Sequence, residues 1–121
     1  ENKIDVEKII ESTKQSQLTN FVDNLEDKLE TQIGESGTLV SGGQRQRIGL
    51  ARSFYFDREI LVFDEATNAL DNETEKKIID YLKSLKSKKT IIFISHNEKL
   101  LGFCDKIYQI SDKSIKLLNK A

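Results

Sequence analysis

The sequence predicts an α/β fold. Two short runs, residues 60–63 and residues 91–94, are apolar at every position, a pattern typical of strands buried on both faces in a parallel sheet. An amphipathic helical pattern separates them, and the order strand, helix, strand is that of a parallel α/β unit. The length of 121 residues suits a single core, and 32% charged residues provide a water-exposed surface, so a folded globular chain is expected.

The first 30 residues combine acidic and lysine side chains with apolar residues at helical spacing, which predicts two short amphipathic helices. Their apolar positions are Val6, Ile9, Ile10, Leu18, Phe21, Val22, Leu25 and Leu29. The stretch from residue 34 to residue 43 is interrupted by glycines and is expected to form a loop.

A longer helix is expected to begin after Ser41, because Gln44 three residues on completes a capping box, and to continue to about Tyr55. Asn72 and Glu75 predict a similar cap at the start of the helix that separates the two apolar strands. The inward stripe of that helix comprises Ile78, Ile79, Leu82 and Leu85.

Residues 106–110 form a third, weaker strand pattern.

The composition of the chain excludes several classes of protein. With 19 basic and 20 acidic residues the net charge is −1, which gives no argument for a nucleic-acid or membrane-surface partner. No apolar run approaches the ~20 residues that a membrane-spanning helix needs. The single cysteine, Cys104, is expected to be a small buried hydrophobe in a reducing compartment.

Two adjacent carboxylates, Asp64 and Glu65, directly follow the first apolar strand. Ligands of open α/β sheets bind at the carboxyl ends of the strands, so both side chains are expected near such a crevice. Asp64 is placed to hold Mg²⁺ beside nucleotide phosphates, and Glu65 to orient or deprotonate an attacking water. The alternative is that the pair starts a turn and caps a helix.

Residues 41–43, Ser-Gly-Gly, stand at a predicted helix start, where unpaired backbone N–H groups form an anion site. A helix N-terminus contributes only ~0.3–2 kcal/mol toward an anion, whereas micromolar nucleotide affinity needs ~8 kcal/mol. Other groups must therefore contribute most of the nucleotide affinity. The alternative is that the segment is a simple turn. His96, the only histidine, follows the second apolar strand and reaches the same rim as Glu65, or is an ordinary exposed loop residue.

Together these elements resemble the C-terminal half of the nucleotide-binding domain of ATP-binding cassette (ABC) proteins, over about residues 18–110. Residues 40–47, Val-Ser-Gly-Gly-Gln-Arg-Gln-Arg, are similar to the family's signature sequence, and residues 60–64 to its Walker B strand. Glu65 resembles the catalytic glutamate, residues 68–71 the D-loop, and His96 the switch histidine. Val40 and Asn68 depart mildly from the commoner Leu and Ser without removing a phosphate donor or a metal carboxylate.

The resemblance implies ATP and Mg²⁺ as cofactors and assigns each site residue a role. Ser41, Gly42, Gly43 and Gln44 would bind an ATP held mainly by a second nucleotide-binding domain in a head-to-tail dimer. Asp64 would position Mg²⁺, Glu65 would activate water, Asp71 would bridge the dimer, and His96 would sense the γ-phosphate. The arginines at positions 45, 47 and 52 match the signature helix and are not a nucleic-acid patch.

Residues 31–37 resemble the X-loop of ABC exporters, which touches the transmembrane domain, and Glu35 is the residue assigned to that contact. This stretch favours an exporter or lipid flippase, with the domain on the cytoplasmic face of the membrane. A soluble ABC ATPase of DNA repair or translation is the alternative. A truncated module that only docks to partners is a third, different hypothesis.

No phosphate-binding loop motif, Gly-x-x-x-x-Gly-Lys-[Ser/Thr], occurs in the sequence, which starts with Glu and contains no Met. The chain is therefore expected to be a fragment of one such domain, with the helical subdomain over about residues 1–56 and part of the core over residues 57–121. By itself it should be inactive. In the family's sheet the P-loop strand separates residues 91–94 from residues 106–110, so either these edges pair with another copy or the last strand is displaced.

Overall fold

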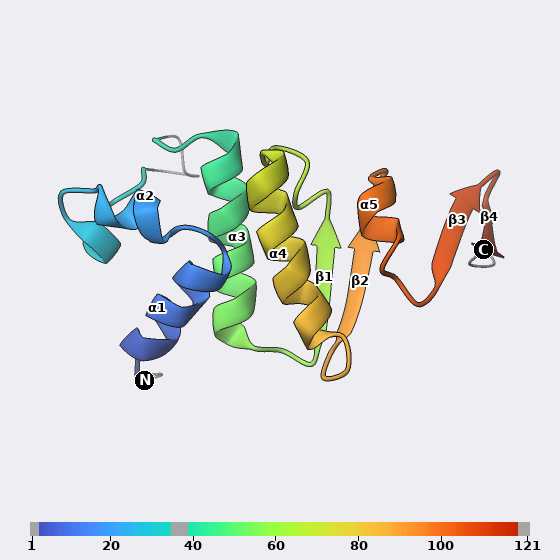
Figure 1. The fold of residues 1–121 in the computed structure, drawn as a ribbon, viewed down its shortest axis with the longest axis horizontal. Coiled ribbons are helices and arrows are strands. Elements are labelled where there is room, and N and C mark those ends of the chain that lie inside the picture. The colour runs from blue at the N-terminus through green and yellow to red at the C-terminus, as the bar shows by residue number, and fades with distance from the viewer. Residues whose placement is uncertain (1–2, 35–38, 119–121) are drawn as a thin grey trace.

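The computed structural model describes residues 3–34 and 39–118 and shows a mixed α/β chain (Figure 1). Helices occupy the N-terminal half, followed by a strand–helix–strand unit, a short helix and a hairpin. In chain order the elements are α1 (Val6–Gln15), α2 (Thr19–Asp23), the 3₁₀ helix η1 (Lys28–Glu30), α3 (Gly42–Phe56), β1 (Ile60–Asp64), α4 (Asn72–Leu85), β2 (Thr90–Ile94), α5 (Glu98–Leu101), β3 (Ile107–Ser111) and β4 (Ser114–Leu118).

The two predicted N-terminal helices are confirmed as α1 and α2. The Asp5 side chain caps α1 by accepting a hydrogen bond from the N–H of Lys8 at 3.0 Å. Helix α1 lies against α3, and Leu18 in the turn between α1 and α2 is buried. Arg47 of α3 donates from Nη1 to the carbonyl of Gln17 at 2.6 Å, which anchors this turn to α3. Arg47 therefore has a structural role within the chain.

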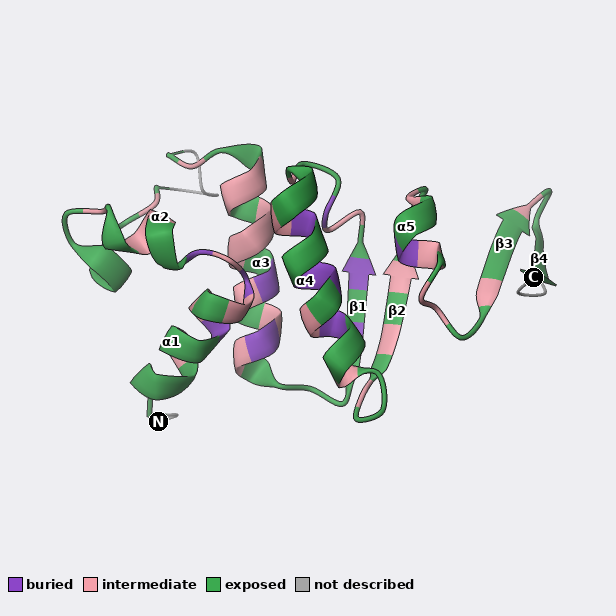
Figure 2. Cartoon of the chain, viewed as in Figure 1, coloured by how far each residue is buried: buried purple, intermediate pink, exposed green. Residues whose placement is uncertain are grey.

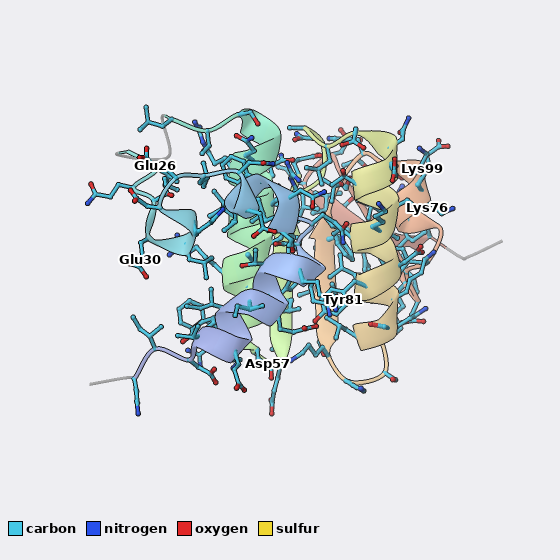
Figure 3. The ribbon with its side chains drawn as sticks, turned by 60° about the vertical axis from the view of Figure 1, so that its left-hand side comes forward. Glu26, Glu30, Asp57, Lys76, Tyr81 and Lys99 are labelled. Carbon is cyan, nitrogen blue, oxygen red and sulfur yellow. The ribbon has the colours of Figure 1, made fainter. Side chains whose placement is uncertain are left out.

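The capping box predicted at the start of α3 is confirmed. The N–H of Gln44 donates to Ser41 Oγ at 3.2 Å, and Gln44 Oε1 accepts from the N–H of Ser41 at 2.8 Å. The helix ends at Phe56, and the C-cap residue Asp57 has a left-handed backbone with φ 50°. The Asp57 carboxylate lies 2.7 Å from Lys89 Nζ, and the hydrogen bond from Lys89 lowers the pKa of Asp57. Asp57 is labelled in Figure 3.

Strands β1 and β2 pair in parallel as predicted, in a register that places Ile60 beside Thr90 and Asp64 beside Ile94. One face of this pair forms the core with α3 and α4 (Figure 2). The buried core residues are Leu50, Phe54, Leu61, Phe63, Ile78 and Leu82. Tyr81 of α4 packs edge-on against Phe54 with ring centroids 4.9 Å apart, and burial raises the pKa of Tyr81.

Burial of both strands on both faces, expected from the continuous apolar runs, is wrong for these residues. Ile60 and Val62 of β1 are 60% and 58% exposed, and Ile92 and Ile94 of β2 are 47% and 53% exposed. Successive side chains of a strand point to opposite faces, and the core helices cover only the face that carries Leu61. The second apolar face is therefore open in the described part of the chain.

The third predicted strand is confirmed as β3, but it does not join β1 and β2. It pairs in antiparallel fashion with β4, which the sequence pattern did not predict. Asp112 and Lys113 connect the two strands, both with left-handed φ, at 48° and 61°. That is the geometry of a tight two-residue hairpin turn, formed here without the usual glycine. The hairpin stands apart from the parallel pair, beyond α5 (Figure 1). Of the two outcomes expected from the sequence, pairing with another copy or a displaced last strand, the chain shows the displaced strand.

No helix among residues 3–34 and 39–118 is long and apolar enough to cross a bilayer.

Candidate functional site

The structure brings Asp64, Glu65 and His96 to one rim, at the carboxyl ends of the two parallel strands. Asp64 is the last residue of β1, and its side chain is exposed. It alternates with buried Phe63 and therefore belongs to the open face of the sheet. His96 follows β2 by two residues and is fully exposed. The predicted position of these three residues at a common rim agrees with the structure.

Glu65 occupies an unusual backbone conformation at this rim. Its φ is 47°, in the left-handed region that residues other than glycine rarely adopt. Its N–H donates to the carbonyl of Ile94 at 2.9 Å, which extends the β1–β2 ladder by one bond. Glu65 Oε1 lies 3.8 Å from His96 Nε2, an ion-pair distance when the imidazole is protonated. The two predicted catalytic side chains thus face each other.

The predicted anion site at residues 41–43 lies at the start of α3. Backbone N–H groups in the first turn of a helix have no intrahelical partner, and the capping box uses that of Gln44, so those of Gly42 and Gly43 are available to an anion. No hydrogen bond or ion pair within the described ranges joins Ser41 to Asp64, Glu65 or His96. One chain therefore carries two separate groups of predicted site residues.

Gln46 connects these two groups, and the sequence analysis missed it. From α3 its Nε2 donates to the carbonyl of Glu65 at 3.0 Å and to Oδ1 of Asn68, while its Oε1 accepts from the N–H of Ala69 at 3.0 Å. A sequence signal for this residue existed. Gln46 stands between Gly43 and Leu50 at helical spacing, so it is a polar residue on the inward face of α3.

Glu75 is a second site residue whose role differs from the prediction. It is 6% exposed, and its Oε1 accepts from Thr67 Oγ1 at 3.0 Å and from Asn97 Nδ2 at 2.7 Å. The predicted cap of α4 by Asn72 and Glu75 is wrong, because Glu75 lies one turn before Ile78 on the buried stripe of the helix. Its carboxylate instead holds together the segments that follow Glu65 and His96.

Asp71 is the observed N-cap of α4. Its Oδ1 accepts from the N–H of Thr74 at 2.9 Å, and its Oδ2 accepts from Thr74 Oγ1 at 2.7 Å. The Thr74 backbone N–H, followed by its hydroxyl, lowers the pKa of Asp71. Asp71 therefore starts α4 one residue earlier than the sequence indicated, and its side chain remains exposed.

The acidic residues at the rim fit a cation only in part. No group of three or more His, Cys, Asp or Glu side chains that could hold a metal occurs in the described ranges. Asp64 offers one carboxylate, which suits Mg²⁺ when phosphate oxygens and water supply the remaining ligands. Glu35, predicted to contact a transmembrane domain, lies outside the described residues.

A family model described as ABC transporter matches residues 1–68. This match covers more than half of the chain, so the chain belongs to the ABC transporter family.

Relatives with curated names agree with this assignment. ATP-dependent lipid A-core flippase 1 of Colwellia psychrerythraea is 46% identical over 99 residues, which are 82% of this chain and 16% of the relative. The ATP-dependent lipid A-core flippase of Pseudoalteromonas translucida is 41% identical over 115 residues, which are 95% of this chain and 20% of the relative. The chain thus spans a fifth or less of the length of these two relatives.

A solved structure shows the same fold. The structure of a bacterial Atm1-family ABC exporter with ATP bound superposes with a TM-score of 0.86 at 30% sequence identity, over 93% of this chain and 20% of that chain. The predicted fold class, part of an ABC nucleotide-binding domain, is confirmed.

Proposed function

We propose that the chain is the C-terminal part of the ATP-hydrolysing domain that powers an ABC exporter or lipid flippase. The observation that carries this proposal is the pairing of Glu65 with His96, 3.8 Å apart at the carboxyl ends of β1 and β2. A carboxylate and an imidazole at this rim have the chemistry to activate a water and to contact a γ-phosphate. The names of the flippase relatives support the transport role.

The rim residues divide the reaction among them. Asp64 would hold Mg²⁺, which supplies charge neutralisation at the phosphate oxygens when bound. Glu65 would accept the proton of the attacking water through its carboxylate. His96 would donate an imidazole N–H to the γ-phosphate, and its full exposure leaves that ring accessible to a nucleotide.

The start of α3 would contact an ATP held by a second nucleotide-binding domain. Ser41, Gly42 and Gly43 would bind its γ-phosphate, with Gln44 beside them as the partner of the capping box. A helix start supplies only ~0.3–2 kcal/mol toward an anion, so this side of a shared site needs a partner domain. Asp71, exposed at the start of α4, would bridge the two domains.

The remaining assignments follow from the same proposal. Residues 1–56 would form the helical part of the domain and residues 57–121 part of its core. The loop containing Glu35 would contact the transmembrane domain, and the whole would lie on the cytoplasmic face of a membrane. No nucleic-acid partner is proposed, since Arg47 anchors the turn before α2 and the net charge is −1.

The 121-residue chain alone is proposed to be inactive, because its sequence contains no P-loop motif to hold the β- and γ-phosphates. A fluorescent ATP analogue titrated into the chain should show no saturable binding below about millimolar concentration. A micromolar Kd, equivalent to ~8 kcal/mol, would overturn this part of the proposal.

The test of the catalytic role uses Glu65→Gln in the longer transporter polypeptide that the proposal implies. The amide keeps the shape of the side chain and removes the base, so ATP binding should persist while kcat falls by about 10²–10⁴-fold. Gln109→Glu, an exposed change on β3, is the matched control and should leave kcat unaltered. Hydrolysis by Glu65→Gln at the wild-type rate would refute the assignment.

A further inference from the structure

We propose that Gln46 is a positioning residue that fixes the loop of residues 65–69 to the start of α3 and thereby sets the orientation of the Glu65 carboxylate. This inference rests on the proposed function, because it concerns how the proposed base is held. Gln46 would thus link two parts of one chain, the helix start that would bind a phosphate and the loop that would activate water.

The side-chain amide of Gln46 can make its bonds in one orientation only. The carbonyl of Glu65 accepts hydrogen bonds and the N–H of Ala69 donates one, so Nε2 must face residue 65 and Oε1 must face residue 69. These two backbone partners also fix the third contact, in which Oδ1 of Asn68 accepts from Nε2. A single amide thus spans both ends of a five-residue loop.

The loop has a specific need for this support at Glu65. Its left-handed φ of 47° carries a strain cost of the kind that persists only where surrounding contacts hold the residue in place. On one side the Glu65 N–H bonds to Ile94 at the end of the sheet, at 2.9 Å. On the other side its carbonyl accepts from Gln46 at 3.0 Å and from the N–H of Asn68 at 3.4 Å. Gln46 makes the shorter of these two bonds and is the one that comes from another element.

The start of α3 lies directly against the same loop. A Cβ added at Gly43 would stand 2.9 Å from the carbonyl oxygen of Ala69, so the backbones approach more closely than any side chain allows. Gly43 precedes Gln46 by about one turn of α3. The close approach at Gly43 and the hydrogen bonds of Gln46 therefore join the start of α3 to the Glu65 loop at two points.

The test compares two substitutions in the longer ATP-hydrolysing polypeptide. Gln46→Met keeps the length of the side chain and the helix propensity but removes every amide bond. Gln46→Glu keeps an oxygen for the Ala69 N–H and loses the donors. We expect Gln46→Met to lower kcat by about 10–100-fold with KM for ATP within about threefold. Gln46→Glu should lower kcat at least as far, because a carboxylate oxygen then faces the carbonyl of Glu65 in place of the amide donor. Ser53→Ala is the matched control, since the Ser53 hydroxyl bonds within its own helix, to Gly49 at 3.2 Å.

A second readout uses the 121-residue chain and does not depend on catalysis. In Gln46→Met the amide hydrogen of Ala69 should exchange about five- to tenfold faster, while the buried amides of Ile78 and Leu82 keep their protection and report an intact core. If Gln46→Met lowers stability too far, it is combined with Gly49→Ala, because a Cβ at Gly49 meets nothing within 4 Å and alanine favours the helix.

The outcomes separate this inference from the proposed function. Wild-type kcat in Gln46→Met, or a raised KM with unchanged kcat, overturns the positioning role while leaving the proposed function standing. Unchanged exchange at Ala69 overturns the hydrogen-bonding basis of the inference. Absence of ATP hydrolysis by the wild-type polypeptide overturns the proposed function, and the catalytic part of this inference falls with it.

Discussion

The buried carboxylate of Glu75 is expected to be a main support of the rim, and Glu75→Ala is the perturbation that measures it. Glu75 Oε1 accepts hydrogen bonds from Thr67 Oγ1 at 3.0 Å and from Asn97 Nδ2 at 2.7 Å, and both Glu75 and Thr67 are buried. Alanine removes the acceptor and leaves the buried Thr67 hydroxyl and the half-buried Asn97 amide without this partner.

The structure gives the size of the effect. Each buried donor left unpaired costs ~1–3 kcal/mol, and relief from holding a buried carboxylate offsets part of the total. A loss of about 2–5 kcal/mol in the free energy of unfolding follows. Whole domains are stable by only ~5–15 kcal/mol, so this single change removes a large share.

Urea denaturation of the 121-residue chain, followed by far-ultraviolet circular dichroism, measures this loss. With a slope of ~1–3 kcal/mol/M, the midpoint should fall by about 1 M or more. Glu73→Ala is the matched control on the same helix, because the Glu73 side chain is 79% exposed and, within the described residues, forms an ion pair with Lys77 across one turn. Its cost should stay within ~0.5 kcal/mol.

A third variant separates the loss of charge from the loss of the acceptor. Glu75→Gln keeps a carbonyl oxygen where Oε1 accepts both bonds, so its midpoint should lie much closer to wild type than that of Glu75→Ala. Equal midpoints for Glu75→Ala and Glu73→Ala would refute the reasoning, since they would show that the Thr67 and Asn97 donors find water or another partner at no cost.

Two further substitutions test the close backbone approach and the helix cap. Gly43→Ala places a Cβ 2.9 Å from the backbone oxygen of Ala69 and should destabilise the chain by ~1–3 kcal/mol in urea titrations. A Cβ at Gly49 has nothing within 4 Å, so Gly49→Ala should stabilise the chain by up to ~1 kcal/mol. Equal effects of the two substitutions would contradict the close contact at Gly43. Asp71→Asn tests the cap through pH. The folded pKa of Asp71 is lowered by Thr74, so its contribution is fully present above the unfolded pKa of ~3.9 and is lost as pH falls through the lower folded value. Urea midpoints measured from pH 6 to pH 2 should therefore fall less steeply for Asp71→Asn than for wild type, and identical slopes would show that the carboxylate adds no acid sensitivity.

Local chemistry explains which parts of the fold and site could be predicted from the sequence. The capping box at Ser41 needs only residues three positions apart, and its two bonds appear as expected. The parallel pairing of β1 with β2 follows from two apolar runs around a helix, and that pairing places Glu65 and His96 at one rim. Each of these predictions rests on short-range pattern plus one rule of sheet topology.

Contacts between distant segments explain what the sequence did not reveal. Gln46 and Ala69 are joined by a hydrogen bond although they are 23 positions apart in the sequence. No periodicity in the sequence specifies which loop a side-chain amide on α3 will contact. Glu75 has the polar character of a cap residue, and only its place on the stripe of Ile78 and Leu82 distinguishes a buried role from an exposed one. The turn at Asp112 and Lys113 lacks glycine, so the hairpin of β3 and β4 gave no turn signal.

The open apolar face of the β1–β2 pair lowers the stability expected for the 121-residue chain. A continuous apolar run indicates that both faces of a strand are buried, but it does not identify the element that covers each face. Ile60, Val62, Ile92 and Ile94 are each about half exposed, and full burial of such side chains is worth ~1.5–3 kcal/mol apiece. Roughly 3–6 kcal/mol of burial is therefore unrealised among the described residues, an amount comparable with the stability of a whole domain. The 121-residue chain should accordingly have a low midpoint in urea, and the loss expected from Glu75→Ala is then large enough to unfold a measurable fraction of it without denaturant.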